Sequence, residues 1–131
     1  MIVMKFGGSS VGSGERIAHV ASITQRVITQ TQTVPLVVVS AMQGVTNNLR
    51  DAARTAASGD ATTFRTIRRD LQTRHEEAID LCVSDIDQRR GLKAEVTSLL
   101  DGLEMLCQSI HTLGELTPRG LDAVSGLGER L

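Results

Sequence analysis

Two glycines and two serines near the start of the chain, Gly7–Ser10, have the composition of a turn that binds phosphate. Such a turn exposes hydroxyls and consecutive backbone N–H groups, which can surround the oxygens of an anion. Lys5 adds a positive charge just before it. A P-loop would need Lys where Ser13 stands, and a dinucleotide fingerprint would need a small residue where Ile17 stands, so neither motif is present. Anion binding and an ordinary strand-to-helix turn both remain open from these residues alone.

Hydroxyl groups also gather in a second loop, between Ser40 and Thr46. Thr46 has the residue type that caps a helix and Ser40 the type that binds a loop amide, so structural roles and ligand binding are equally compatible with both. Near the other end of the sequence, Glu129 stands beside Arg130. An exposed helical residue paired with its neighbour is the ordinary interpretation of such a glutamate.

The elements that position the two loops form one strand–helix–strand unit. Ile2–Phe6 predicts a strand, Ser13 predicts a helix cap, and the unbroken apolar run Leu36–Val39 is typical of a parallel strand covered on both faces. A crossover between parallel strands brings their carboxyl ends to the same edge of the sheet. The glycine turn and Ser40 are therefore predicted to be neighbours, at the edge where ligands bind in open α/β sheets.

The rest of the chain is predicted to be helical, with a helical hairpin inserted after the strand–helix–strand unit. The expected helices cover residues 49–57, 64–83, 92–113 and 118 to the end, separated by Gly59, Gly91 and Gly114. An apolar stripe is expected to face the core through Val96, Leu99, Leu100, Leu103, Leu106 and Ile110. Two strands leave edges without partners, so the fold class is α/β and the chain is expected to be one portion of a larger sheet.

Composition argues against several classes of partner. Fourteen Lys and Arg against fifteen Asp and Glu leave a net charge of −1, which gives no field for nucleic acid or an anionic membrane. Two Phe and no Trp or Tyr provide no stacking platform for bases. No apolar run approaches the roughly 18 residues of a membrane span, and the first residues show no secretory pattern, so a cytoplasmic location is expected.

Two further groups of side chains receive structural interpretations. Cys82 and Cys107 match no metal-ligand spacing and fall among apolar helical positions, which predicts buried, reduced thiols. A cluster of arginines is offset by nearby carboxylates, which predicts a solvated helix face. The cluster consists of Arg65, Arg68, Arg69 and Arg74.

Three motifs in a fixed order carry a resemblance to a known family. Lys5–Val11, Val38–Asn47 and Gly128–Leu131 resemble the ordered motifs of the aspartate kinases, and the first of them is highly specific. The resemblance covers the whole chain, but only the first part of the family's catalytic domain. It implies the amino acid kinase fold, a three-layer α/β sandwich. Residues 1–131 would be its N-terminal portion, with a helical insertion at about 47–116, and the nucleotide-binding half and the regulatory ACT domains would be absent.

The resemblance also implies a site. ATP and Mg²⁺ would be the cofactors, with the metal bound through the phosphates and not by protein ligands, and L-aspartate would be the substrate. Lys5 would act in catalysis, Glu129 would receive the α-amino group of aspartate, and Ser9 stands where many relatives have Thr. The residues implied for the nucleotide phosphates are Lys5, Phe6, Gly7, Gly8 and Ser9. Those implied for aspartate are Ser40, Thr46 and Glu129.

The implied reaction is the phosphorylation of the aspartate side-chain carboxylate to 4-phospho-L-aspartate, the first step of lysine, threonine and methionine biosynthesis. The parent enzyme is expected to be a homo-oligomer, and the chain alone is expected to be inactive. Two alternatives stay open. One is another amino acid kinase, acting on glutamate or N-acetylglutamate, and the other is a non-catalytic binding or assembly module.

Overall fold

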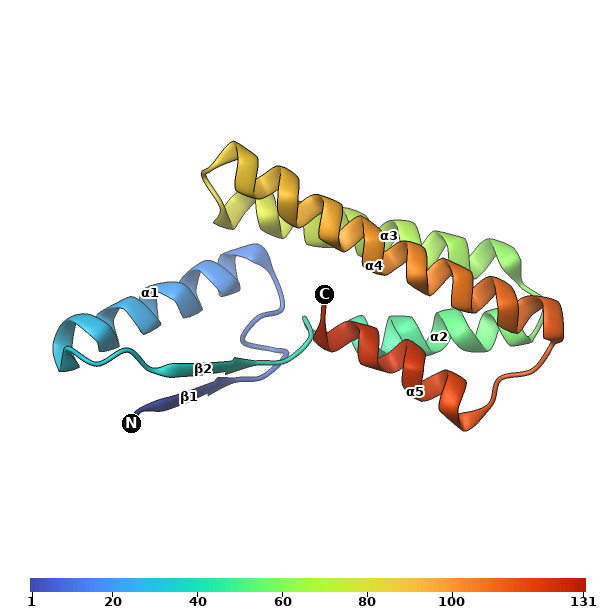
Figure 1. The fold of residues 1–131 in the computed structure, drawn as a ribbon, viewed down its shortest axis with the longest axis horizontal. Helices are drawn as coiled ribbons and strands as arrows, with labels where there is room; N and C mark the ends of the chain where they lie inside the picture. Colours follow the sequence, from blue (N-terminus) through green and yellow to red (C-terminus); the bar gives the residue numbers. More distant parts are fainter.

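Two parallel strands and five α-helices make up the computed structural model, which describes all residues from Met1 to Leu131. A small sheet with one helix beside it occupies one end of the molecule, and a bundle of helices occupies the other (Figure 1). In chain order the elements are β1 (Val3–Phe6), α1 (Gly14–Thr31), β2 (Leu36–Val39), α2 (Val45–Ala57), α3 (Ala61–Cys82), α4 (Ile86–Leu113), α5 (Pro118–Gly126) and a 3-10 turn (Leu127–Glu129).

The strand–helix–strand unit forms as predicted. β1 pairs in parallel with β2, in a register that joins Val3 to Leu36 and Phe6 to Val39. The Ser13 side chain caps α1 by accepting a hydrogen bond from the Arg16 backbone N–H at 3.4 Å. Because the strands run in the same direction, the turn after β1 and the loop after β2 leave the sheet at the same edge.

The prediction that β2 is covered on both faces is wrong for this chain. All four of its residues are exposed, with 57% of Leu36 and 55% of Val39 accessible. The reason is that the sheet has only two strands, and α1 is the one helix that lies along it (Figure 1). The side chains of β2 are therefore apolar although this chain leaves them exposed.

The hydrophobic core lies among the helices. α3 and α4 form the predicted hairpin, α2 packs against both, and α5 packs against α2 (Figure 1). The central side chains are at most 1% exposed: Leu49, Phe64, Leu71, Leu100 and Leu103. On α4 the buried stripe runs through Val96, Leu100, Leu103, Cys107 and Ile110. Cys107 takes the place predicted for Leu106, which is exposed, because the stripe continues at alternating steps of four and three residues.

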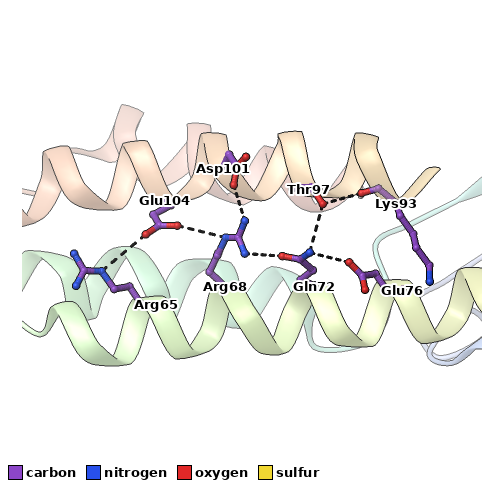
Figure 2. Close-up of polar contacts among 8 residues, drawn as sticks. All are labelled: Arg65, Arg68, Gln72, Glu76, Lys93, Thr97, Asp101 and Glu104. Carbon is purple, nitrogen blue, oxygen red and sulfur yellow. Dashed lines mark hydrogen bonds and ion pairs between the residues drawn. The ribbon is translucent and has the colours of Figure 1, made fainter. Parts of the chain in front are cut away.

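A seam of polar contacts joins α3 to α4 (Figure 2). Arg68 lies at its centre, with Nη2 2.5 Å from Asp101 Oδ1 and Nε 3.4 Å from Glu104 Oε2. The Arg68 side chain is 19% exposed, so the expected solvated face is wrong for this residue. Gln72 extends the seam by donating to Glu76 at 2.7 Å and to Thr97 at 3.4 Å.

Some predicted boundaries and burials differ from the structure. Gly91 lies inside α4, which begins five residues earlier because the Asp85 side chain caps it by accepting from the Gln88 N–H at 2.8 Å. The last helix ends at Gly126 and gives way to the 3-10 turn. Cys107 is buried as predicted, and desolvation raises its pKa to about 11, whereas Cys82 is exposed at the end of α3. None of the helices has the length and apolar character needed to cross a membrane.

Candidate functional site

The glycine turn after β1 lies against the loop after β2. The turn is closed by a hydrogen bond from the Ser10 N–H to the Gly7 carbonyl at 2.8 Å. A Cβ atom on Gly8 would lie 3.2 Å from the Ala41 carbonyl oxygen and 3.5 Å from Gln43 Cα. The predicted neighbourhood of the two loops is therefore correct. Neither Gly7 nor Gly8 has a positive φ, so the close approach of the two loops is what requires glycine at position 8.

The end of the chain reaches the same loop from the helical bundle. A Cβ atom on Gly128 would lie 3.1 Å from Leu49 Cδ1, 3.4 Å from Ala41 Cβ and 3.5 Å from Thr46 Oγ1. The 3-10 turn that carries Glu129 is thus packed against the start of α2 and the second loop. All three motifs of the sequence, although far apart along the chain, meet in one region.

Ser40 and Glu129 share the wall of one cavity of about 440 Å³. The rest of the wall is largely apolar and comes from the end of β2, from α1 and from the facing side of α3. Ser40 is half-buried and donates its hydroxyl proton to the Ala41 carbonyl at 3.1 Å, so it binds a loop carbonyl and not the loop amide that was considered. Glu129 is exposed, which leaves its carboxylate accessible to a ligand.

Thr46 is the second residue of α2 and does not cap it. The N-cap is Gly44, whose φ of 84° lies in the left-handed region that favours glycine. The Thr46 hydroxyl therefore does not cap the helix, and the capping role considered for it is wrong. The hydroxyl lies at the start of the helix, next to Gly128, where backbone N–H groups without helical partners favour a negative charge.

The residues expected at the phosphates lie beside this cavity and not in it. Phe6 and Ser9 line a separate hollow of about 290 Å³ with Arg16 and His19 of α1. Lys5 is exposed and, because side chains alternate along a strand, it points to the face of the sheet opposite Phe6. Lys5, Gly7, Gly8 and Thr46 line neither space, so no single cavity of this chain holds every predicted residue.

Two arginines hold the backbone around the glycine turn, and the sequence interpretation assigned neither to the site. Arg16 donates from Nη1 to the Ser9 carbonyl. Arg74, on α3, donates from Nη2 to the Gly12 carbonyl at 2.8 Å and is half-buried, so the expected solvated face is wrong here too. Arg16 stood in the first turn of the predicted helix, close enough to be suspected. Arg74 is 62 residues from its partner, and no local pattern points to it.

His75 contributes a buried imidazole to the wall of the larger cavity. It is 4% exposed, and its Nδ1 lies 2.7 Å from the Leu71 carbonyl, which makes Nδ1 the protonated nitrogen. Burial lowers the pKa of His75, and the charge of Arg74 lowers it further, so the ring is neutral at neutral pH. Nε2 is buried without a hydrogen-bond partner.

The fold and the meeting of the three motifs agree with comparisons to known proteins. The model of the amino acid kinase family matches residues 1–131, and the chain belongs to that family. Within the family, it is similar to aspartokinases. It is 33% identical to aspartokinase 3, chloroplastic, of Arabidopsis thaliana, over 97% of this chain and 21% of that protein.

Two other relatives point the same way. The chain is 33% identical to bifunctional aspartokinase/homoserine dehydrogenase 1, chloroplastic, of Arabidopsis thaliana, over 97% of this chain and 13% of that protein. It is 50% identical to the aspartate kinase of Pseudomonas fluorescens (strain SBW25) over 60 residues, 46% of this chain and 14% of that protein. The chain thus spans about a fifth or less of the length of these relatives. It corresponds to the N-terminal region of an aspartate kinase, within a partial amino acid kinase-like α/β domain.

Proposed function

We propose that this chain serves as the amino-terminal part of an aspartate kinase. That enzyme transfers the γ-phosphoryl group of ATP to the side-chain carboxylate of L-aspartate, which begins the synthesis of lysine, threonine and methionine. The observation that carries the proposal is the meeting of the glycine turn, the second loop and the Gly128–Glu129 segment. The similarity to aspartokinases supports the choice of substrate.

The glycine turn has the properties needed to receive the phosphates of ATP. Gly8 packs so closely on Ala41 that no side chain fits between the loops, and a turn of this composition would offer backbone N–H groups to an anion. Lys5, with Phe6, Gly7 and Ser9 around the turn, would place one ammonium group against the phosphate charge. Mg²⁺ bound with the nucleotide would supply further neutralisation of the phosphate charge.

The second loop and the end of the chain have the properties needed to receive aspartate. The Glu129 carboxylate would bind the α-ammonium group, while the hydroxyls of Ser40 and Thr46 would orient the rest of the molecule. A carboxylate is already ionised at neutral pH, so the attack needs no general base. The chain's own contribution is to align two anions that otherwise repel one another.

The test is Mg-ATP-dependent formation of an acyl phosphate, trapped as the hydroxamate, by the longest natural reading frame that contains this chain. Aspartate, glutamate and N-acetylglutamate are compared as substrates. Turnover selective for aspartate is expected. Turnover selective for another acid would overturn the substrate and keep the family, and absence of turnover with every acid would favour a binding or assembly module.

Two further properties of the parent protein belong to the proposal. We expect a homo-oligomer in the cytoplasm. The plant relatives are named as chloroplastic proteins, so location is the part of the proposal that relatives support least. Cell fractionation and the mass of the purified protein in solution measure these two properties.

A further inference from the structure

We propose that Arg74, on α3, is a positioning residue that holds the glycine turn and the second loop in register. The inference rests on the proposed function for its kinetic consequence, and on contacts within the chain for its structural one. It gives α3 a direct part in forming the site.

The first contact fixes the segment that leaves the glycine turn. Arg74 Nη2 donates to the Gly12 carbonyl at 2.8 Å, and the side chain is half-buried. A Cβ atom on Gly12 would lie 3.3 Å both from the Gly8 carbonyl oxygen and from Gln43 Cβ. Holding Gly12 therefore also limits the movement of the glycine turn and of the second loop packed on it.

The other arm of the same guanidinium lies next to the second loop without a hydrogen bond to it. Arg74 Nη1 would be 3.9 Å from a Cβ atom on Gly44, the N-cap of α2, so it occupies the space beside that residue. A planar guanidinium presents several donors in a fixed fork, so one group can span two backbone segments, whereas an ammonium is a single point. Arg74 thus stands between the segments that we propose to bind phosphate and aspartate.

Neighbouring contacts keep α3 fixed against the start of α1. A Cβ atom on Gly14 would lie 3.1 Å from Ala78 Cα, and Cys82 Sγ donates to the Gly14 carbonyl at 3.1 Å. Because α3 is anchored at these points, the base of the Arg74 side chain has a defined place relative to the loops. The guanidinium is then held at a fixed position relative to Gly12 and Gly44.

Arg74 differs from the other arginines of its cluster because it has no carboxylate partner. Arg65, Arg68 and Arg69 each have a carboxylate within 4 Å, and Arg74 has none. Its neighbour His75 is neutral, as its lowered pKa requires. The uncompensated positive charge of Arg74 lies beside the two loops, where it also suits a site for anions.

Two substitutions test the proposal against a matched control. Arg74→Met removes charge and donors, Arg74→Lys keeps the charge and one donor, and Arg69→Met removes an exposed arginine of the same helix that contacts only Asp70, at 3.7 Å. Amide hydrogen exchange of the chain is followed in residues 7–14 and 40–46, at a temperature well below each unfolding midpoint. We expect exchange in both segments to become roughly tenfold faster in Arg74→Met, less so in Arg74→Lys, and to stay unchanged in Arg69→Met.

Kinetics of the longest reading frame give the second readout. We expect Arg74→Met to lower kcat/KM for Mg-ATP by about tenfold to a hundredfold, with kcat affected as well as KM and with partial recovery in Arg74→Lys. Unchanged exchange in both segments would overturn the positioning role, whatever the kinetics. If exchange is faster while no acid is phosphorylated by the unsubstituted protein, the proposed function fails and the positioning role stands.

Discussion

At the scale of single residues, the role proposed for Lys5 at the phosphates can be tested by substitution. We expect Lys5→Ala to lower kcat/KM by more than two orders of magnitude, on the order of 3 kcal/mol, as for the loss of one oriented electrostatic donor. The other lysine, Lys93, is paired with Asp80 at 2.7 Å on the helical hairpin, so Lys93→Ala is the control and should keep its activity. Steady-state hydroxamate assays measure kcat and KM of both variants. Nearly full kcat in Lys5→Ala would show that Lys5 has no catalytic role.

Gly8 and Gly7 provide a matched pair at the glycine turn. A methyl group on Gly8 meets the backbone oxygen of Ala41 at 3.2 Å, and backbone cannot turn aside as a side chain can. We expect Gly8→Ala to lower the free energy of unfolding by about 1–2 kcal/mol and to separate the loops. A Cβ on Gly7 meets nothing within 4 Å, so Gly7→Ala should change stability by less than about 0.5 kcal/mol. Urea denaturation checks both values, and equal effects would contradict the packing argument.

His75 predicts a pH dependence of stability. Its pKa in the folded state is lowered by burial, so as the pH falls below about 6.5 the unfolded chain takes up a proton first. The contribution of neutral His75 to the free energy of unfolding should therefore be complete above that pH. It should decrease as the pH falls below it, until the pH passes the lowered pKa of the folded state. His75→Gln should flatten this part of the curve. Denaturation of both proteins at a series of pH values is the measurement.

At the scale of elements, Arg68 links α3 to α4 through two carboxylates (Figure 2). Its guanidinium is mostly buried and lies within 3.4 Å of two carboxylates, which are 59% and 42% exposed. Arg68→Met removes a buried charge but leaves two carboxylates that water can reach. The free energy of unfolding should therefore fall by about 1–2 kcal/mol, which is less than the cost of breaking a fully buried ion pair. Arg69→Met is again the control and should be nearly neutral. Thermal unfolding distinguishes them, and equal midpoints would show that the seam adds little.

The sequence predicted those elements whose signals are local. Ile2–Phe6, Ser13 and Leu36–Val39 define the strand–helix–strand unit, and the parallel crossover then requires the glycine turn and Ser40 to be neighbours. The predicted start of α4 is wrong, because the Asp85 side chain caps the helix before Ile86 and Gly91 does not interrupt it. The stripe of α4 was nearly correct, with Cys107 in place of Leu106.

The candidate site could be predicted only in part, for a physical reason. Motifs that lie on the sheet edge are found by their composition, whereas Arg74 reaches Gly12 across 62 residues and Arg68 reaches Asp101 across 33. Such partners depend on how the helices pack, and no pattern of period two or 3.6 encodes them. The charge balance of the local sequence suggested solvation, but the neutralising carboxylates of Arg65 and Arg68 lie on the next helix.

At the scale of the whole molecule, binding measurements can test which ligand contacts of the proposed kinase lie within these residues. The chain holds the segments proposed for aspartate and for the phosphates, but it spans about a fifth or less of the length of its relatives. We expect weak binding of L-aspartate and little binding of Mg-ATP to the purified chain, because the expected adenine site is not among these residues. Isothermal titration with each ligand is the measurement. Tight binding of ATP would show that the account of the nucleotide site is wrong.

The distribution of the core has a consequence for how substitutions will be tolerated. All sixteen residues of the main buried cluster lie between Ala41 and Val124, whereas neither strand has a buried residue. In a library of single substitutions scored separately for cellular abundance and for growth that depends on the enzyme, the two maps should diverge. Changes at the buried positions of α2–α4 should deplete the protein itself, while changes at the exposed residues Lys5, Ser9 and Glu129 should leave its amount intact and reduce growth.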